Sequence, residues 1–259
     1  MIEPLTTVNI LDIPIYDGDI PSATGIVLDT CSDLERVSRR VSATGAHGLV
    51  DSKADPHLAK VLRSCFLNLP DGMPGVWIGR LKGAKKIRRC YGPDFFASVL
   101  SASASLPIGH FFCGGNPGVA EELRSSVMRK FKNGNVLGTF CPPFAGIEEY
   151  DYRGIAEKIN ETKADIVWIG LSSPKQEKFA ERLASFTNVH FIITVGAAFD
   201  FHTGRVKQAP RFIQNIGMEW LFRLVTEPRR LYKRYFRIVP FFICYSILDL
   251  LSTNSTNRR

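Results

Sequence analysis

The chain has 259 residues, of which 45% are hydrophobic and 22% are charged. This composition excludes an intrinsically disordered chain, and the length suits one large α/β domain or one domain with an extension. The net charge of +8 is uneven, because residues 205–237 hold nine Lys/Arg against two Glu and residues 1–204 sum to about zero. The excess positive charge predicts an anionic partner for the C-terminal part, such as phosphates, a lipid surface or nucleic acid.

The first third of the chain predicts short elements separated by turns. Leu34, Val37 and Val41 have the spacing of an amphipathic helix, and residues 67–77 are rich in Pro and Gly. The predicted elements are entry strands and turns over 1–30, a helix over 32–41, a turn over 42–48, a helix over about 51–64 and a loop over 67–77.

From residue 108 onward, apolar runs of strand length alternate with helical patterns. The predicted strands cover 108–113, 135–138, 166–171 and 191–195. The predicted helices are one that ends near residue 131, one over 151–162 and one over 174–183. The alternation predicts an α/β fold with a doubly wound, Rossmann-like parallel sheet. After Gly204 the chain becomes basic, aromatic and helical, with a break at Glu227 and Pro228. We therefore expect a Rossmann-like core over residues 1–205 and a helical appendage over 206–259.

Polar residues follow the predicted strands, at the edge where open α/β sheets bind ligands. Gln176 and Glu177 begin a helix; Glu177 fits a helix-capping role, whereas Gln176 has no evident local role and its amide is suited to bind a base or a sugar. Asp200 fits either a ribose- or base-binding acid or a helix cap. Gly114 and Gly115 open a loop that suits either phosphate contact or a tight turn, because the G-x-G-x-x-G pattern is incomplete.

Asp71 lies between Pro70 and Gly72, in a constrained loop. A carboxylate at a strand edge can act as a general base, and the alternative is a turn aspartate bonded to its own backbone. His47 and His202 are isolated and lack ligand spacing, so no metal site is predicted.

Aromatic and basic side chains are interleaved through residues 219–237. This pattern suits a bilayer interface or single-stranded nucleic acid, and the apolar residues that follow favour the membrane. No spanning helix is predicted, because the apolar run over 238–248 is short and contains Pro240. The six scattered cysteines predict free thiols in a reducing cytosol.

Eight motifs in order make the chain resemble the WecG/TagA/CpsF family of bacterial glycosyltransferases over roughly residues 40–237. They are GAHG after Thr44, PDGMP from Pro70, RCYGPD from Arg89, FFCGGNPG from Phe111, SPKQE from Ser173, VGAAFDFHTG from Val195, AP at Ala209, and GMEWLFR from Gly217 with EPRRL from Glu227.

The resemblance implies an inverting, metal-independent transfer of a hexose or N-acetylhexosamine from a UDP-sugar to a polyprenyl-diphosphate-linked saccharide, in exopolysaccharide or cell-wall biogenesis. It implies a cytoplasmic enzyme held peripherally at the inner membrane face, in contact with anionic lipid. By position, Asp71 matches the candidate base, Thr44 a residue near the donor sugar, and Arg89 an active-site residue. Gln176 and Asp200 match the nucleotide end. The appendage would place four arginines over the diphosphate: Arg223, Arg229, Arg230 and also Arg234.

The chain departs from the family pattern at two places, since Ser172 replaces a common glycine and Ala46-His47 stand where an asparagine is usual. Both departures concern sugar specificity. A nicotinamide enzyme is the first rival, but it needs a full glycine fingerprint and a ribose acid. The second is a basic nucleic-acid- or membrane-binding module without transferase activity, although no nucleic acid is expected. The apolar appendage also suits packing on a second subunit, in a homo-oligomer.

Overall fold

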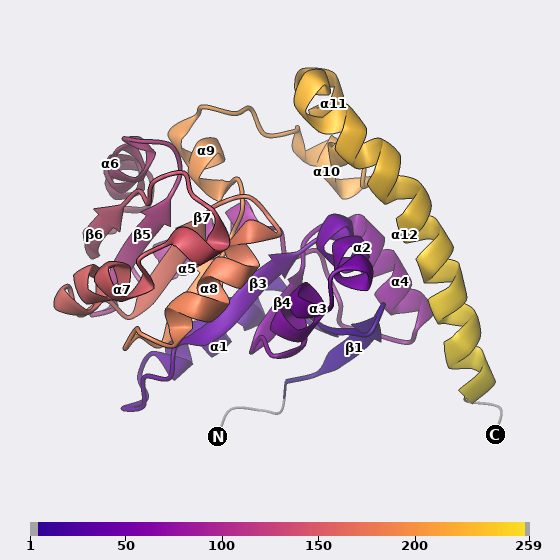
Figure 1. Ribbon diagram of the computed structural model, residues 1–259, viewed down its shortest axis with the longest axis horizontal. Coiled ribbons are helices and arrows are strands. Elements are labelled where there is room, and N and C mark those ends of the chain that lie inside the picture. The colour runs from indigo at the N-terminus through magenta and orange to yellow at the C-terminus, as the bar shows by residue number, and fades with distance from the viewer. Residues whose placement is uncertain (1–4, 257–259) are drawn as a thin grey trace.

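A six-stranded parallel sheet forms the centre of the computed structural model, which describes residues 5–256 and their side chains except those of 215, 230 and 253–256 (Figure 1). Neighbouring strands pair in the order β4-β3-β8-β7-β5-β6. The strands are β3 (Arg39–Thr44), β4 (Leu67–Pro70), β5 (His110–Gly114), β6 (Val136–Phe140), β7 (Ile166–Gly170) and β8 (Phe191–Thr194). Because all pairs are parallel, the six carboxyl ends meet at one edge. The predicted doubly wound α/β fold is confirmed.

Helices cover both faces of this sheet. One face carries α1 (Ile20–Thr30), α5 (Gly92–Ala102), α6 (Val119–Phe131) and α9 (Ala198–Thr203), and the other carries η1 (Ile147–Glu149), α7 (Tyr152–Glu161) and α8 (Lys175–Ala184). On the first face the centre of the Phe96 ring lies 4.8 Å from that of Trp168 and 6.2 Å from that of Phe199. On the second face, the ring centres of Tyr150 and Phe179 are 5.1 Å apart. Burial of these large rings supplies much of the driving force that holds the layers together.

A third core lies beside β4, under a β-hairpin and the C-terminal helix. Its elements are β1 (Thr7–Ile10), β2 (Ile13–Tyr16), α2 (Ala46–Ala54), α3 (Pro56–Arg63), α4 (Met73–Leu81) and α12 (Pro228–Thr256). Ile238 and Phe242 insert into this core from α12. Near the end of α12, Asp249 pairs with Lys82 at 2.7 Å and accepts a hydrogen bond from Leu11 N at 3.0 Å. The appendage is therefore packed against the rest of the chain.

The helix predicted over 32–41 is wrong. Leu34 and Val37 are exposed, Ser38 has a φ of +49°, and Val41 is buried within β3. The three apolar residues therefore do not form one buried stripe, and the spacing was coincidental.

The helix predicted over 51–64 is two helices. Pro56 has no backbone N–H with which to continue α2, and the Asp55 carboxylate accepts a hydrogen bond from Leu58 N at 3.0 Å, which caps α3. The loop predicted over 67–77 is also wrong, since β4 and α4 occupy most of it. Leu67 and Leu69 are buried because they pack in the core on the first face of the sheet, with residues of α1 and α5.

The appendage consists of α10 (Arg211–Asn215), α11 (Glu219–Thr226) and α12, a long helix along one side of the molecule (Figure 1). Pro228 begins α12, as the predicted break at Glu227 and Pro228 requires. The helix continues through Pro240, and Ile238 and Phe242 on either side of it are packed in the third core. By length and composition alone, residues 231–252 are long and apolar enough to cross a membrane, contrary to the expectation drawn from the shorter run over 238–248.

Candidate functional site

The predicted site residues follow different strands but return to the same edge of the sheet. Thr44 ends β3, Asp71 follows β4, Gly114 ends β5, and Asp200 lies in the helix after β8. Gln176 lies in the first turn of α8, after β7. Parallel pairing of the strands brings these segments, far apart in sequence, to one edge.

Asp71 is held at this edge by two neighbouring segments. Its backbone N–H donates to Thr44 O at 3.1 Å, and its Oδ1 accepts a hydrogen bond from Gly92 N at 3.1 Å. The carboxylate therefore bonds to a distant amide and not to its own turn, contrary to the turn-aspartate alternative. Burial raises the pKa of Asp71 to about 6, and the Glu219 carboxylate acts in the same direction. Such a carboxylate is suited to take a proton near neutral pH.

Thr44 turns its hydroxyl into the sheet. The Oγ1 lies 3.0 Å from Ser42 Oγ and 3.3 Å from Asn68 Oδ1, and the side chain is buried. Its contact with the site runs through its backbone carbonyl, which accepts the Asp71 N–H. Thr44 thus helps to position Asp71, and its predicted place near a donor sugar stays a prediction.

Gln176 has a local structural role that the sequence did not reveal. Its Oε1 accepts a hydrogen bond from Gly196 N at 3.1 Å, and its Nε2 donates to Glu177 Oε1 at 2.9 Å. Both side chains are buried, and burial raises the pKa of Glu177. The pair therefore ties the start of α8 to the turn after β8, where Asp200 sits in the first turn of α9. Contact of Gln176, Glu177 and Asp200 with a nucleotide stays a prediction.

The two glycines after β5 are required by the backbone. Gly114 has a φ of +125° and Gly115 a φ of +77°, a region that side chains other than glycine rarely adopt. The Gly115 N–H donates to Gly170 O at 2.8 Å, so this amide is already used within the fold. The tight-turn interpretation accounts for both positions.

Replacement of Gly114 by alanine is expected to destabilise the fold by at least roughly 1–3 kcal/mol, the cost of a strained backbone. A Cβ at this position would lie 2.7 Å from Gly170 O, with no flexible side chain to give way. Gly118→Ala is the matched control, because its φ is also positive but a Cβ there meets no atom within 4 Å. Urea unfolding measures both, and equal losses would contradict the close-approach explanation.

Arg89 lies beside Asp71, in the segment before α5. Its guanidinium pairs with Glu219 of α11 and donates from Nη1 to Gln214 Oε1 at 2.8 Å. Arg223, one turn after Glu219, lies 3.7 Å from Glu227, and its guanidinium carbon is 5.6 Å from the centre of the Phe201 ring. The appendage therefore contributes charged groups of both signs to the edge.

His47 was assigned no role from the sequence. Its pKa shows which appendage arginines lie near it. Burial lowers the pKa of His47 to about 3, and the charges of Arg234 and Arg223 act in the same direction. Arg229 is exposed on α12, and the side chain of Arg230 lies outside the described residues. Of the predicted arginines, Arg223 and Arg234 lie near enough to His47 to lower its pKa. Contact of any of the four with a diphosphate stays a prediction.

Glu219 is the principal residue that the sequence did not single out. It lies within the Gly217–Arg223 motif but outside the predicted set, and a lone acid in a basic segment gave little signal. Among residues 5–256, no group of three or more His, Cys, Asp or Glu side chains gathers to form a metal site.

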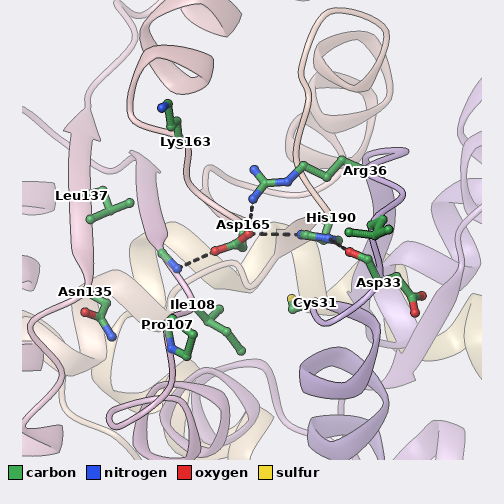
Figure 2. Close-up of a pocket in the computed structure, with 12 residues that line it drawn as sticks. Cys31, Asp33, Arg36, Pro107, Ile108, Asn135, Leu137, Lys163, Asp165 and His190 are labelled. Carbon is green, nitrogen blue, oxygen red and sulfur yellow. Dashed lines mark hydrogen bonds and ion pairs between the residues drawn. The ribbon is translucent and has the colours of Figure 1, made fainter.

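A separate hollow of about 480 Å³ lies at the opposite, amino-terminal edge of the sheet (Figure 2). Its buried acid, Asp165, accepts hydrogen bonds from Gly109 N and Arg36 Nη2, each at 2.7 Å, and lies 3.2 Å from His190 Nδ1. These contacts join the starts of β5, β7 and β8 to the loop after α1. Because the Asp165 carboxylate is engaged in these contacts, it is not a proton acceptor comparable to Asp71.

Comparisons with known proteins show the family of the chain. The model of the glycosyl transferase WecG/TagA/CpsF family matches residues 8–256. The chain is also 29% identical over 223 residues to N-acetylglucosaminyldiphosphoundecaprenol N-acetyl-beta-D-mannosaminyltransferase of Bacillus spizizenii, which covers 86% of this chain and 84% of that protein. The family match spans the sheet, its carboxyl edge and the appendage, and the chain therefore belongs to the WecG/TagA/CpsF family of glycosyltransferases.

Proposed function

We propose that this glycosyltransferase moves an N-acetylhexosamine or hexose, with inversion, from a UDP-sugar to a polyprenyl-diphosphate-linked saccharide. The observation that supports this most is the Asp71 carboxylate at the carboxyl edge of the sheet, held by Gly92 N and close enough to Arg89 and the appendage arginine Arg223 for both to lower its pKa. The Bacillus spizizenii relative is named for transfer of N-acetylmannosamine to a lipid-diphosphate-linked N-acetylglucosamine. The product would enter the assembly of a cell-wall polymer or an exopolysaccharide.

In the proposed reaction, Asp71 takes the proton from the attacking hydroxyl of the acceptor. That oxygen forms a bond to the anomeric carbon from the face opposite UDP, and the bond from this carbon to the diphosphate breaks. Negative charge grows on the departing UDP, and Arg223 and Arg234 supply the positive charge that stabilises it. No metal is required in this scheme, because guanidinium groups hold the phosphate oxygens.

The appendage over residues 206–259 is the proposed membrane-proximal part, attached to a transferase core over 1–205. Its α12 helix has a buried side and an outward side, and the outward side carries Tyr232, Phe236, Ile243 and Ile247. Aromatic and apolar groups beside basic ones suit the headgroup region of an anionic bilayer. The enzyme would then act peripherally at the inner face of the cell membrane, where its lipid-linked acceptor lies. A second copy of the chain is the alternative occupant of this outward side.

The first test is thermal unfolding of the full chain with UDP, with UDP-sugars, with NAD and with an oligonucleotide. A ligand that binds only the folded state raises the unfolding midpoint; at 100 times its dissociation constant the gain is about 2.7 kcal/mol. A rise with UDP or one UDP-sugar, and none with NAD, is the expected result. A rise with NAD alone would favour a nicotinamide enzyme. Stabilisation by the oligonucleotide alone, weakening steeply with salt, would favour a nucleic-acid-binding module.

A further inference from the structure

The Arg89 guanidinium contacts side chains of the appendage and of its own segment, where Asp94 Oδ2 lies 3.8 Å from Nη1. Its Nη1 donates to Gln214 Oε1 at 2.8 Å, its Nη2 pairs with Glu219, and its central carbon lies 4.1 Å from the centre of the Tyr91 ring. Gln214 is itself fixed, because its Nε2 donates to Ala209 O at 2.6 Å. The side chains of Arg89 and Glu219 are only 14% and 15% exposed, so water screens their attraction weakly.

The backbone that carries Arg89 is joined directly to the proposed base. Cys90 N donates to Pro70 O at 2.9 Å, and Gly92 N donates to Asp71 Oδ1 at 3.1 Å. The segment over 89–92 therefore runs along the end of β4. Arg89 is therefore held next to Asp71 by the backbone as well as by its own side chain.

We propose that Glu219 is a positioning residue for the transfer reaction: its carboxylate, carried by α11, fixes the Arg89 guanidinium beside Asp71. This inference rests on the proposed function, in which Asp71 is the base. Two acceptors, Gln214 and Glu219, hold the two ends of the planar guanidinium, which sets its orientation as well as its position. A lysine in place of Arg89 could not be held by both acceptors in this fixed fork.

The charge of Glu219 also acts on Asp71 itself. The titratable groups that face Asp71 are Arg89, Cys90 and Tyr91 from the segment before α5, and Glu219 and Arg223 from α11. Burial raises the pKa of Asp71, and Glu219 adds to this effect, whereas the two arginines oppose it. Burial also raises the pKa of Cys90 and Tyr91, so both stay uncharged near neutral pH. Without the Glu219 charge, burial alone opposes the two arginines, and Asp71 should release its proton at a lower pH.

The test is a titration of the full chain by NMR, with ¹³C-labelled aspartate and with the Asp71 signal assigned through Asp71→Asn. Glu219→Gln keeps an oxygen that accepts from Arg89 but removes the charge, and should lower the Asp71 midpoint by about half a pH unit. Glu219→Asp should restore most of that shift. Glu219→Ala should also abolish the upfield ring-current shift that Tyr91 imposes on the Arg89 side-chain protons.

Glu122→Gln is the matched control, because it removes the same charge from an exposed ion pair with Arg205, 2.8 Å long, on α6. It should leave the Asp71 midpoint unchanged. An unmoved midpoint in folded Glu219→Gln, or unmoved Arg89 shifts in Glu219→Ala, would overturn the positioning role. Failure of the parent protein to bind UDP would instead overturn the proposed function, and the two NMR results would still decide what Glu219 does.

Discussion

Asp71→Asn is expected to lower the turnover number by about 10²–10⁴-fold, the usual contribution of a positioned general base. The asparagine amide has nearly the same shape and can still accept the hydrogen bond from Gly92 N, but it cannot take a proton. Transfer of N-acetylmannosamine from its UDP derivative to an N-acetylglucosaminyl-diphosphoryl lipid, as in the name of the relative, is the first reaction to assay.

The pH dependence of the parent enzyme should carry the same signature. Because burial raises the pKa of Asp71 to about 6, the base is protonated below this pH and kcat/KM should fall tenfold for each further unit of acid. Asp71→Asn should lose this acidic limb along with most of its activity. A parent profile that stays flat down to pH 4 would contradict the assignment of Asp71 as the base.

Three controls separate chemistry from binding and folding. UDP affinity should change little in Asp71→Asn, because the diphosphate is proposed to bind the arginines. Its unfolding midpoint at pH 8 should not fall, since the substitution removes a buried negative charge that the parent must keep. Asp29→Asn, the same change on the exposed side of α1, should leave turnover unchanged. Full activity in Asp71→Asn would reject the proposed mechanism.

Strands β5, β7 and β8 are predictable from the sequence because each is apolar on both faces. Runs such as Phe111–Cys113 and Ile166–Ile169 can be buried only in the middle of a sheet, and the helical patterns between them leave a parallel arrangement as the simple solution. The region before residue 81 was harder, because β3 and β4 gain burial from partners distant in sequence. Val41 is paired with β8, and the strand that holds Leu69 packs against β2 of the β1–β2 hairpin. No local pattern in the sequence reveals those neighbours.

The location of the site was predictable for a topological reason, whereas the state of its side chains was not. Residues that follow parallel strands must meet at one edge, and Asp71, Thr44 and Asp200 do. The sequence does not reveal that Thr44 turns its hydroxyl toward Asn68, or that Gln176 is used by Gly196. Such hydrogen bonds are made or lost when separate elements shift by a few tenths of an ångström relative to one another. For the same reason the partner of Arg89 had to be found in the structure.

The outward side of α12 is expected to hold the enzyme on anionic lipid. Phe236 is 86% exposed and Ile247 53% exposed, on the side of the helix away from Ile238 and Phe242. Burying one such side chain contributes about 1.5–3 kcal/mol, so losing two of them should weaken binding by at least tenfold. Co-sedimentation of Phe236→Glu/Ile247→Glu with phosphatidylglycerol vesicles measures this loss. Deletion of residues 206–259 is a poorer test, because it would also uncover the third core.

Leu34→Glu/Val37→Glu is the matched control for this experiment. Both residues are exposed and apolar, at 103% and 50%, and they lie in the loop between α1 and β3. The charge added is the same, so general repulsion from the anionic vesicles affects both double variants alike. If lipid covers the outward side of α12, only the α12 variant loses vesicle binding, and its sedimentation coefficient without lipid matches that of the parent. If a second copy covers it, the α12 variant changes from dimer to monomer while vesicle binding stays as it was, and the membrane proposal fails.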